Sequence, residues 1–464
     1  MSPWKNNKHY LPEVIHIPLL KEEFTKIIKS TFVRNVLTIV SGAAVAQIIT
    51  IAFAPIITRI YGPEAFGVFG VFMSIVGIFT PIVALTYPVA IVLPKEDEDA
   101  KALVRISIYV AITMSTTIFL LLIFFYQPIG HYLQITEIRS YLVLIPFFMF
   151  FSATTQVAQQ WLIRKRQFYV RAKIDVIQAI IVNIGKTCAG LISPIATVLI
   201  LIASLGQALY AMMLTWGARF VTIRDKREDP DKTITSSNLL EIAKHHYDFP
   251  LYRAPEAFIN GVSQSLPVLL LSSFFGPVSA GFYVIGITVL SLPSQLISHS
   301  VGDVFYPHIA EASKNNENLT PLIAKATLGL AAIGFIPFGI VVVLGPWLFG
   351  FVFGADWIIA GEYARWLALW IFFGFCNIPS VKAIPVLSAQ LFLLIFSILT
   401  LIIRLATLAI GSFVFMSDKI AIALFGISGA VLYIVLILVT LLISKQYDGT
   451  TRRNISFTNE RNKL

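Results

Sequence analysis

The chain has 464 residues, of which 57% are hydrophobic and 13% are charged, and its mean hydropathy is +0.80. A soluble domain needs a surface rich in charged residues, so this composition excludes a soluble protein and indicates an all-α polytopic membrane protein. The net charge of +10 does not indicate a nucleic-acid partner. In membrane proteins, positive charge gathers in cytoplasmic loops, where it also attracts anionic lipid headgroups.

Apolar stretches of about 20 residues or more predict membrane-spanning helices. About twelve such helices are expected, near residues 33–57, 65–93, 102–126, 139–162, 170–193, 195–221, 249–275, 278–303, 321–345, 357–379, 383–411 and 419–445. They divide into two lobes of six helices around a central cationic cavity. The expected organisation is a leader at 1–31, which is either an interfacial helix or a solvated tail, an N-lobe at 32–222, a linker at 223–248, a C-lobe at 249–445 and a tail at 446–464.

Two Gly-Pro turns join long apolar runs in corresponding places of the two halves. Gly62-Pro63 is followed four residues later by Gly67, and 214 residues further on Gly276-Pro277 is followed in the same way by Gly281. A repeat at about half the chain length is typical of duplicated transporters that work by alternating access. The glycines permit helices to approach closely, which suits a gate, although ordinary helix packing is the simpler explanation for any one of them.

Counting basic residues predicts the orientation, because cytoplasmic loops carry an excess of Lys and Arg. With the N-terminus inside, 29 of the 35 basic residues fall on the cytoplasmic side and four on the other. The remaining two, Lys186 and Arg404, lie within spans. Both termini are therefore expected in the cytoplasm.

The residues around the first turn carry a resemblance to a known family. The run from Thr58 to Phe69, together with Tyr87-Pro88-Val89-Ala90 and the acidic segment that ends at Ala100, resembles a Wzx-type O-antigen flippase, a polysaccharide exporter of the multidrug/oligosaccharidyl-lipid/polysaccharide superfamily. Pro88 departs from the glutamate expected in many relatives.

The resemblance implies two helical lobes and a multi-pass protein of the bacterial inner membrane. It implies export of undecaprenyl-pyrophosphate-linked oligosaccharide, for O-antigen or another polysaccharide, from the cytoplasmic to the periplasmic leaflet. The implied partners are this lipid, membrane lipids, and a polymerase and a chain-length regulator of the same pathway, with the chain itself a monomer. No catalytic residue, cofactor or metal site is expected.

Basic and polar residues inside spans are the candidate substrate contacts, because a diphosphate and sugar hydroxyls need a polar path through hydrocarbon. Lys186 lies near the predicted midplane on one stripe with Asp175, Gln178 and Asn183. The alternative is a structural lysine that is neutral or paired with a carboxylate.

Further candidates lie on other predicted spans. The seventh predicted helix carries Arg253, Glu256, Asn260 and Gln264 on one face, although Arg253 and Glu256 also have the spacing of an ion pair. The eighth carries Gln295. Arg34 and Arg59 mark the two ends of the first helix, and Arg404 is expected near the outer interface, where arginines commonly reach toward lipid phosphates. Glu256 and Asp175 are the candidates for ion coupling.

Two other functions fit a polytopic chain. A cation-coupled multidrug exporter would need an acidic, aromatic cavity, and a membrane-embedded glycan polymerase would need a long outward loop to hold catalytic groups. All the predicted outward loops are short, and the deepest predicted charge is the cation Lys186. Both features favour the flippase.

Overall fold

The computed structural model describes residues 31–124, 141–228 and 239–461, and in these ranges the regular structure is helical throughout. The long helices are α2 (Thr31–Phe79), α4 (Asp97–Phe124), α6 (Leu144–Arg164), α7 (Phe168–Ile192), α8 (Ala196–Glu228), α10 (Ala254–Phe275), α11 (Pro277–Lys314), α12 (Leu319–Phe353), α13 (Ile358–Cys376), α15 (Gln390–Phe413) and α16 (Asp418–Arg461). Short helices are α3 (Tyr87–Ala90), α9 (Leu239–His245), α14 (Ile378–Ala383), a π-helical turn at Phe249–Arg253 and a 3₁₀ turn at Ala355–Trp357. The all-α prediction is confirmed.

Nine described helical stretches are long and apolar enough to cross a membrane. One of them, Gly42–Phe79, is two helices, because Gly62 within it has φ 69° and ψ 172°. Only glycine adopts this conformation at low cost. Together with α6 and α11, this makes twelve long helices in the described ranges, as the sequence predicts.

Two predicted helices have wrong boundaries. The second was expected to run to 93, but α2 ends at Phe79 because Pro81 follows and because Leu85 and Thr86 have positive φ angles of 47° and 56°. The eleventh was expected from 383, but α15 begins at Gln390, after the separate helix α14. The predicted leader, 1–31, lies almost wholly outside the described residues.

The stretches expected as linker and tail contain helix. α8 extends into the expected linker as far as Glu228, and α9 lies within that stretch. α16 continues to Arg461, so residues expected as a tail prolong the last helix. The boundaries proposed for the lobes stay predictions.

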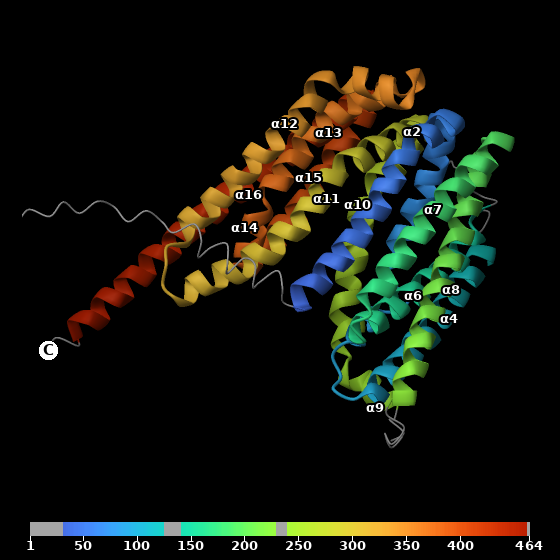
Figure 1. The fold of residues 1–464 in the computed structure, drawn as a ribbon. Helices are drawn as coiled ribbons and strands as arrows, with labels where there is room; N and C mark the ends of the chain where they lie inside the picture. Colours follow the sequence, from blue (N-terminus) through green and yellow to red (C-terminus); the bar gives the residue numbers. More distant parts are fainter. Residues whose placement is uncertain (1–30, 125–140, 229–238, 462–464) are drawn as a thin grey trace, which may run out of the picture.

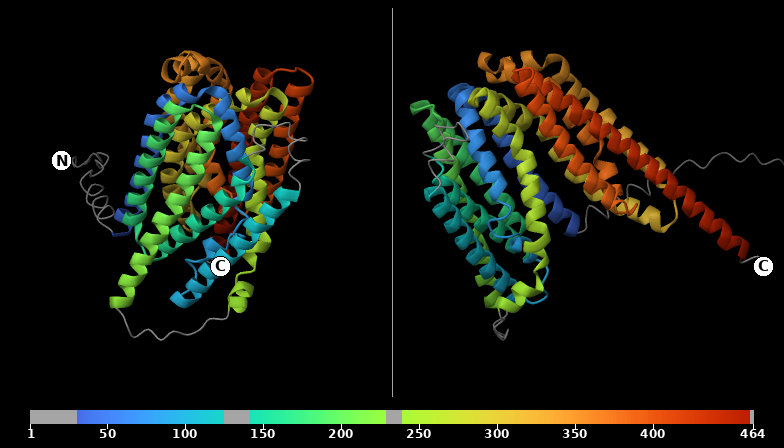
Figure 2. Two further views of the ribbon diagram at one scale, coloured as in Figure 1. Left: turned by 90° about the vertical axis from the view of Figure 1, so that its right-hand side faces the viewer. Right: turned by 180° about the vertical axis from the view of Figure 1, so that it is seen from behind.

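The helices form two groups. Figure 1 shows α12, α13, α15 and α16 on one side and α4, α6, α7 and α8 on the other, with α2, α10 and α11 between them. The right panel of Figure 2 shows that the groups converge at one end and diverge toward the other. We call the first the Gly-Pro end and the second, where α9 lies, the linker end.

Contact between the groups is closest where the two Gly-Pro repeats meet. A Cβ atom on Gly67 would lie 1.7 Å from the carbonyl oxygen of Pro277, and one on Gly281 would lie 2.0 Å from the carbonyl oxygen of Pro63. Each glycine therefore packs against the proline of the other repeat. This reciprocal contact is what a pseudo-twofold axis between the halves requires.

We expect Gly67→Ala to destabilise the protein by about 1–3 kcal/mol, the usual range for overpacking, because its methyl group collides with backbone that cannot rotate away. The matched control is Gly339→Ala, since no atom lies within 4 Å of that position. Thermal unfolding in one detergent measures both variants. Equal melting temperatures for the two variants would contradict the close crossing.

Candidate functional site

Lys186 lies on α7, and its side chain reaches over an aromatic ring of α2. The ammonium nitrogen is 5.0 Å from the centroid of Phe69, a cation–π contact. The backbone carbonyl of Lys186 accepts a hydrogen bond of 2.7 Å from the hydroxyl of Tyr61, which fixes α7 against α2. Among the described residues no carboxylate pairs with this ammonium group. The structural alternative of an ion-paired lysine therefore has no support in the described part of the chain.

The other polar residues of α7 contact neighbouring helices. Asn183 is buried, and its amide donates to Thr50 on α2 at 3.3 Å and to the carbonyl of Ala179 at 2.7 Å. Asp175 accepts a hydrogen bond from the hydroxyl of Tyr210 on α8 and lies 3.9 Å from Nε of Arg171. Only part of the predicted stripe is therefore free to meet a substrate.

The predicted polar stripe of the seventh span, which we call the stripe of α10, is exposed. Arg253 ends the π-helical turn just before α10, and Glu256, Asn260 and Gln264 lie on α10 itself. No ion pair joins Arg253 to Glu256, so that alternative is not observed. The face of α10 beside this stripe packs on α2, where a Cβ on Gly261 would lie 2.9 Å from the carbonyl oxygen of Gly77.

Two candidates cannot be placed. Arg34 belongs to α2 and Gln295 to α11, but the side chains of both lie outside the described residues. Their roles stay predictions.

Arg59 connects the two groups of helices at the Gly-Pro end. Its guanidinium donates a hydrogen bond of 2.8 Å to the carbonyl of Phe351, in the last turn of α12. A cation at a helix C-terminus is also favoured by the helix dipole. Beside it, Trp357 donates to the carbonyl of Thr58 at 3.1 Å and packs edge-on against Phe66, with the ring centroids 5.4 Å apart. In this conformation Arg59 closes the Gly-Pro end.

Arg404 is turned inward and lies against aromatic rings. Its guanidinium carbon is 4.8 Å from the ring of Trp370 on α13 and 5.7 Å from the ring of Phe425 on α16. The sequence predicts that Arg404 reaches toward lipid phosphates at the interface. In the structure its side chain packs against aromatic rings of α13 and α16 instead.

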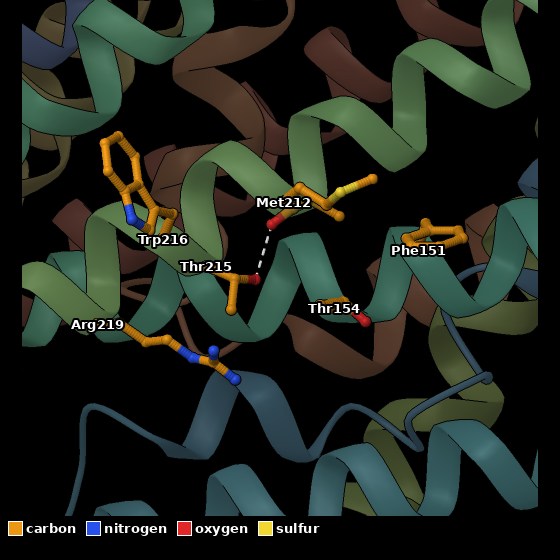
Figure 3. Close-up of a pocket in the computed structure, with 7 residues that line it drawn as sticks. Phe151, Thr154, Met212, Thr215, Trp216 and Arg219 are labelled. Carbon is orange, nitrogen blue, oxygen red and sulfur yellow. Dashed lines mark hydrogen bonds between the residues drawn. The ribbon is translucent and has the colours of Figure 1, made fainter.

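A groove of about 310 Å³ lies between α6 and α8, lined by Phe151, Thr154, Ala211, Met212, Thr215, Trp216 and Arg219 (Figure 3). The hydroxyls of Thr154 and Thr215 donate to carbonyls of their own helices, at 3.0 and 2.7 Å, so Arg219 is the only charged group that lines it. In Figure 1, α6 and α8 lie on the side away from α12, α13, α15 and α16. The groove is therefore separate from the region between the groups.

Comparison with known proteins identifies the family. The sequence profile described as "Polysaccharide biosynthesis protein" matches residues 56–361, more than half of the chain. The chain belongs to this family. No curated protein gives a significant match.

Solved structures with the same fold are transporters. The chain is similar to the lipid II flippase MurJ in an inward closed conformation, with a TM-score of 0.64, 14% identity and 86% of each chain covered. It is also similar to an inward-facing multidrug resistance MATE family transporter of the MOP superfamily, with a TM-score of 0.60, 13% identity, and coverage of 88% of this chain and 96% of that one. For an outward-facing MATE transporter the TM-score is 0.55, the identity 12% and the coverage 92% and 98%.

At these identities the likeness establishes the fold. The family match confirms the predicted resemblance to a polysaccharide biosynthesis family, and the long apolar helices confirm a multi-pass membrane protein.

Sequence reasoning missed the partners of Arg59 and Arg404. Phe351 and Trp357 follow Arg59 by almost 300 residues, and no local pattern connects them. The sequence did contain one signal for this contact, because Gly354 is a third glycine that ends an apolar helix. In the structure Gly354 has a φ of 115° and lies beside the side chain of Arg59.

We expect Arg59→Gln to loosen the Gly-Pro end, because a hydrogen bond from a charged donor contributes about 1.5–3 kcal/mol. Spin labels at the exposed positions Glu64 on α2 and Trp347 on α12, with Cys188 and Cys376 replaced by serine, report the separation of these two helices by pulsed electron resonance. The expected result is a longer or broader distance distribution than in the labelled parent.

Arg365→Gln is the control, because Arg365 makes the same kind of bond, 2.7 Å to the carbonyl of Val343, between two helices of one group. A distance distribution that shifts equally in both variants, or in neither, would contradict a specific closing role for Arg59.

Proposed function

We propose that this chain is a flippase that carries an undecaprenyl-pyrophosphate-linked oligosaccharide from the cytoplasmic to the outer leaflet by alternating access. The polyprenyl tail stays in the lipid while the charged and hydroxylated head crosses between the two groups of helices. The observation that carries the proposal is Lys186, an intramembrane cation without a carboxylate partner in the described structure. An uncompensated charge in a span is costly, and it marks the place where an anion passes.

The charge distribution supports an inward-facing state. Most basic residues fall in loops on the side of the linker, which the positive-inside rule assigns to the cytoplasm. The groups of helices diverge at that end and are closed at the other by Arg59, Trp357 and the crossed Gly-Pro repeats. The substrate head would therefore enter from the cytoplasm.

The membrane potential is a sufficient driving force in this account. Moving a dianion outward from an inside-negative cell gains about 4–5 kcal/mol per 100 mV, twice the value for one charge. If an ion is coupled as well, Glu256 is better placed than Asp175. Glu256 is exposed and has no ion-pair partner in the described part of the chain, whereas the carboxylate of Asp175 already accepts a hydrogen bond from Tyr210 and lies beside Arg171.

We expect Lys186→Ala to slow flipping in proteoliposomes by about 10- to 100-fold, because a contact between a cation and a diphosphate is worth about 1.5–3 kcal/mol. Lys186→Arg, which keeps the charge, should retain most of the activity. The flipping rate is measured as the rate at which a lipid-linked oligosaccharide becomes accessible to an external glycosidase, with and without an imposed potential.

The control for this experiment is Lys101→Ala, since Lys101 pairs with Glu98 near the start of α4 and such partly exposed pairs contribute little. Full activity of a well-folded Lys186→Ala protein would make Lys186 structural. Absence of flipping by the parent, with export of a cationic drug instead, would favour the multidrug exporter.

The polar stripe of α10 suits the sugar hydroxyls. Asn260 and Gln264 are exposed amides one turn apart, and each offers both a donor and an acceptor. We expect Asn260→Ala and Gln264→Ala each to slow flipping by about 2- to 10-fold, the equivalent of one neutral hydrogen bond. Ile259→Ala is the control, because Ile259 is exposed on the same helix and has no polar group. If the loss of flipping rate in these two variants does not increase with the number of sugar units in the substrate, sugar recognition by this stripe is contradicted.

A further inference from the structure

The two halves place a basic residue on equivalent helices. α7 is the fifth long helix of the first half when α2 is counted as two, and α15 is the fifth of the second. When α7 and α15 are aligned at their first residues, Lys186 corresponds to Leu408, one helical turn after Arg404. Residues four apart lie on the same helix face. Arg404 therefore lies on the helix and face that correspond to those of Lys186.

Aromatic rings lie beneath both basic groups. The ring beneath Lys186 belongs to Phe69. The rings against Arg404 belong to Trp370 and Phe425, and Tyr283, which stands 214 residues after Phe69, packs edge-on against Phe425 with the ring centroids 6.4 Å apart. Phe69 and Tyr283 also adjoin the crossing of α2 and α11, since a Cβ on Gly70 would lie 2.5 Å from Cγ2 of Val284. Each half therefore places one basic group against aromatic rings on its fifth long helix.

The surroundings of Arg404 hold donors that have no acceptor. Nε of Arg404, Nε1 of Trp370 and the hydroxyl oxygen of Thr400 are buried, and none of them has a hydrogen-bond partner among the described residues. Trp370 is only 8% exposed. No carboxylate of the described residues pairs with Arg404.

Such an arrangement is expensive without a counter-ion. A buried donor that lacks an acceptor costs about 1–3 kcal/mol, and more when it is charged. The stack on Trp370 and Phe425 recovers part of this cost but satisfies no N–H group. An acceptor with negative charge would satisfy the charge and the donors together.

We propose that Arg404, on its aromatic platform of Trp370 and Phe425, forms a second anion-binding site that takes a phosphate or diphosphate group. It is the C-lobe counterpart of the Lys186 site. That the bound group belongs to the transported lipid rests on the proposed function, whereas the anion site itself does not.

Calorimetric titration of the full chain in nanodiscs of zwitterionic lipid tests the site, with inorganic pyrophosphate as the probe. Arg404→Gln should remove pyrophosphate binding at the Arg404 site, which Lys186→Gln leaves intact. The double variant should lose pyrophosphate binding at both the Arg404 site and the Lys186 site. Trp370→Phe, which keeps an aromatic ring but removes the N–H group, should weaken the Arg404 site severalfold. Arg219→Gln makes the same charge change in the separate groove between α6 and α8 and should leave binding unchanged.

The outcomes separate this proposal from the function. Pyrophosphate binding that is identical in the parent, Arg404→Gln and Trp370→Phe would overturn the site, even if Lys186 is essential for flipping. Loss of binding in Arg404→Gln supports it, even if flipping fails. A second experiment adds undecaprenyl diphosphate to the nanodisc. If it displaces pyrophosphate from the Arg404 site, the natural ligand of the site is the transported lipid. If pyrophosphate stays bound, the natural ligand is free phosphate. The anion site stands in both cases.

Discussion

The close crossing of two Gly-Pro helices is the contact on which the rest of this structure depends. Gly67 and Gly281 each lie against the backbone of the opposite repeat, at a distance that no side chain tolerates. This brings the start of α11 against the second half of α2 and joins the two groups of helices at one end. Arg59 and Trp357 then add hydrogen bonds across the same end. At the other end the groups diverge, and the exposed polar face of α10 belongs to this open arrangement.

Much of this fold is predictable because the signals are local or periodic. Apolar stretches predict all twelve helices, and the repeated Gly-Pro turn predicts both the duplication and its contact. The errors arise where tertiary structure overrides hydropathy. Residues 80–86 are as apolar as the helix before them, yet Pro81 and the positive φ angles of Leu85 and Thr86 break it. Tyr87 then donates to the carbonyl of Ala243 at 3.3 Å, a partner more than 150 residues away.

The candidate site is predictable in its residue types and less so in its orientations. Lys186 has no carboxylate partner among the described residues, and the stripe of α10 is exposed, as their positions on helices predict. Asn183 belongs to the same sequence stripe as Lys186 but binds Thr50, because α7 turns that part of its face toward α2. Arg404 was expected at a lipid interface, and its inward orientation depends on rings of α13 and α16 that no local pattern places beside it.

The central claim is that intramembrane cations offset the charge of a crossing diphosphate. The most direct test compares the parent chain with Lys186→Ala on two substrates that carry the same oligosaccharide and polyprenyl chain, one linked by diphosphate and one by an uncharged ether. The account predicts that the substitution slows the diphosphate substrate by at least about tenfold, or about 1.4 kcal/mol, and leaves the uncharged one unaffected. Equal losses on both substrates would contradict it, because Lys186 would then support the fold and not the passage of charge.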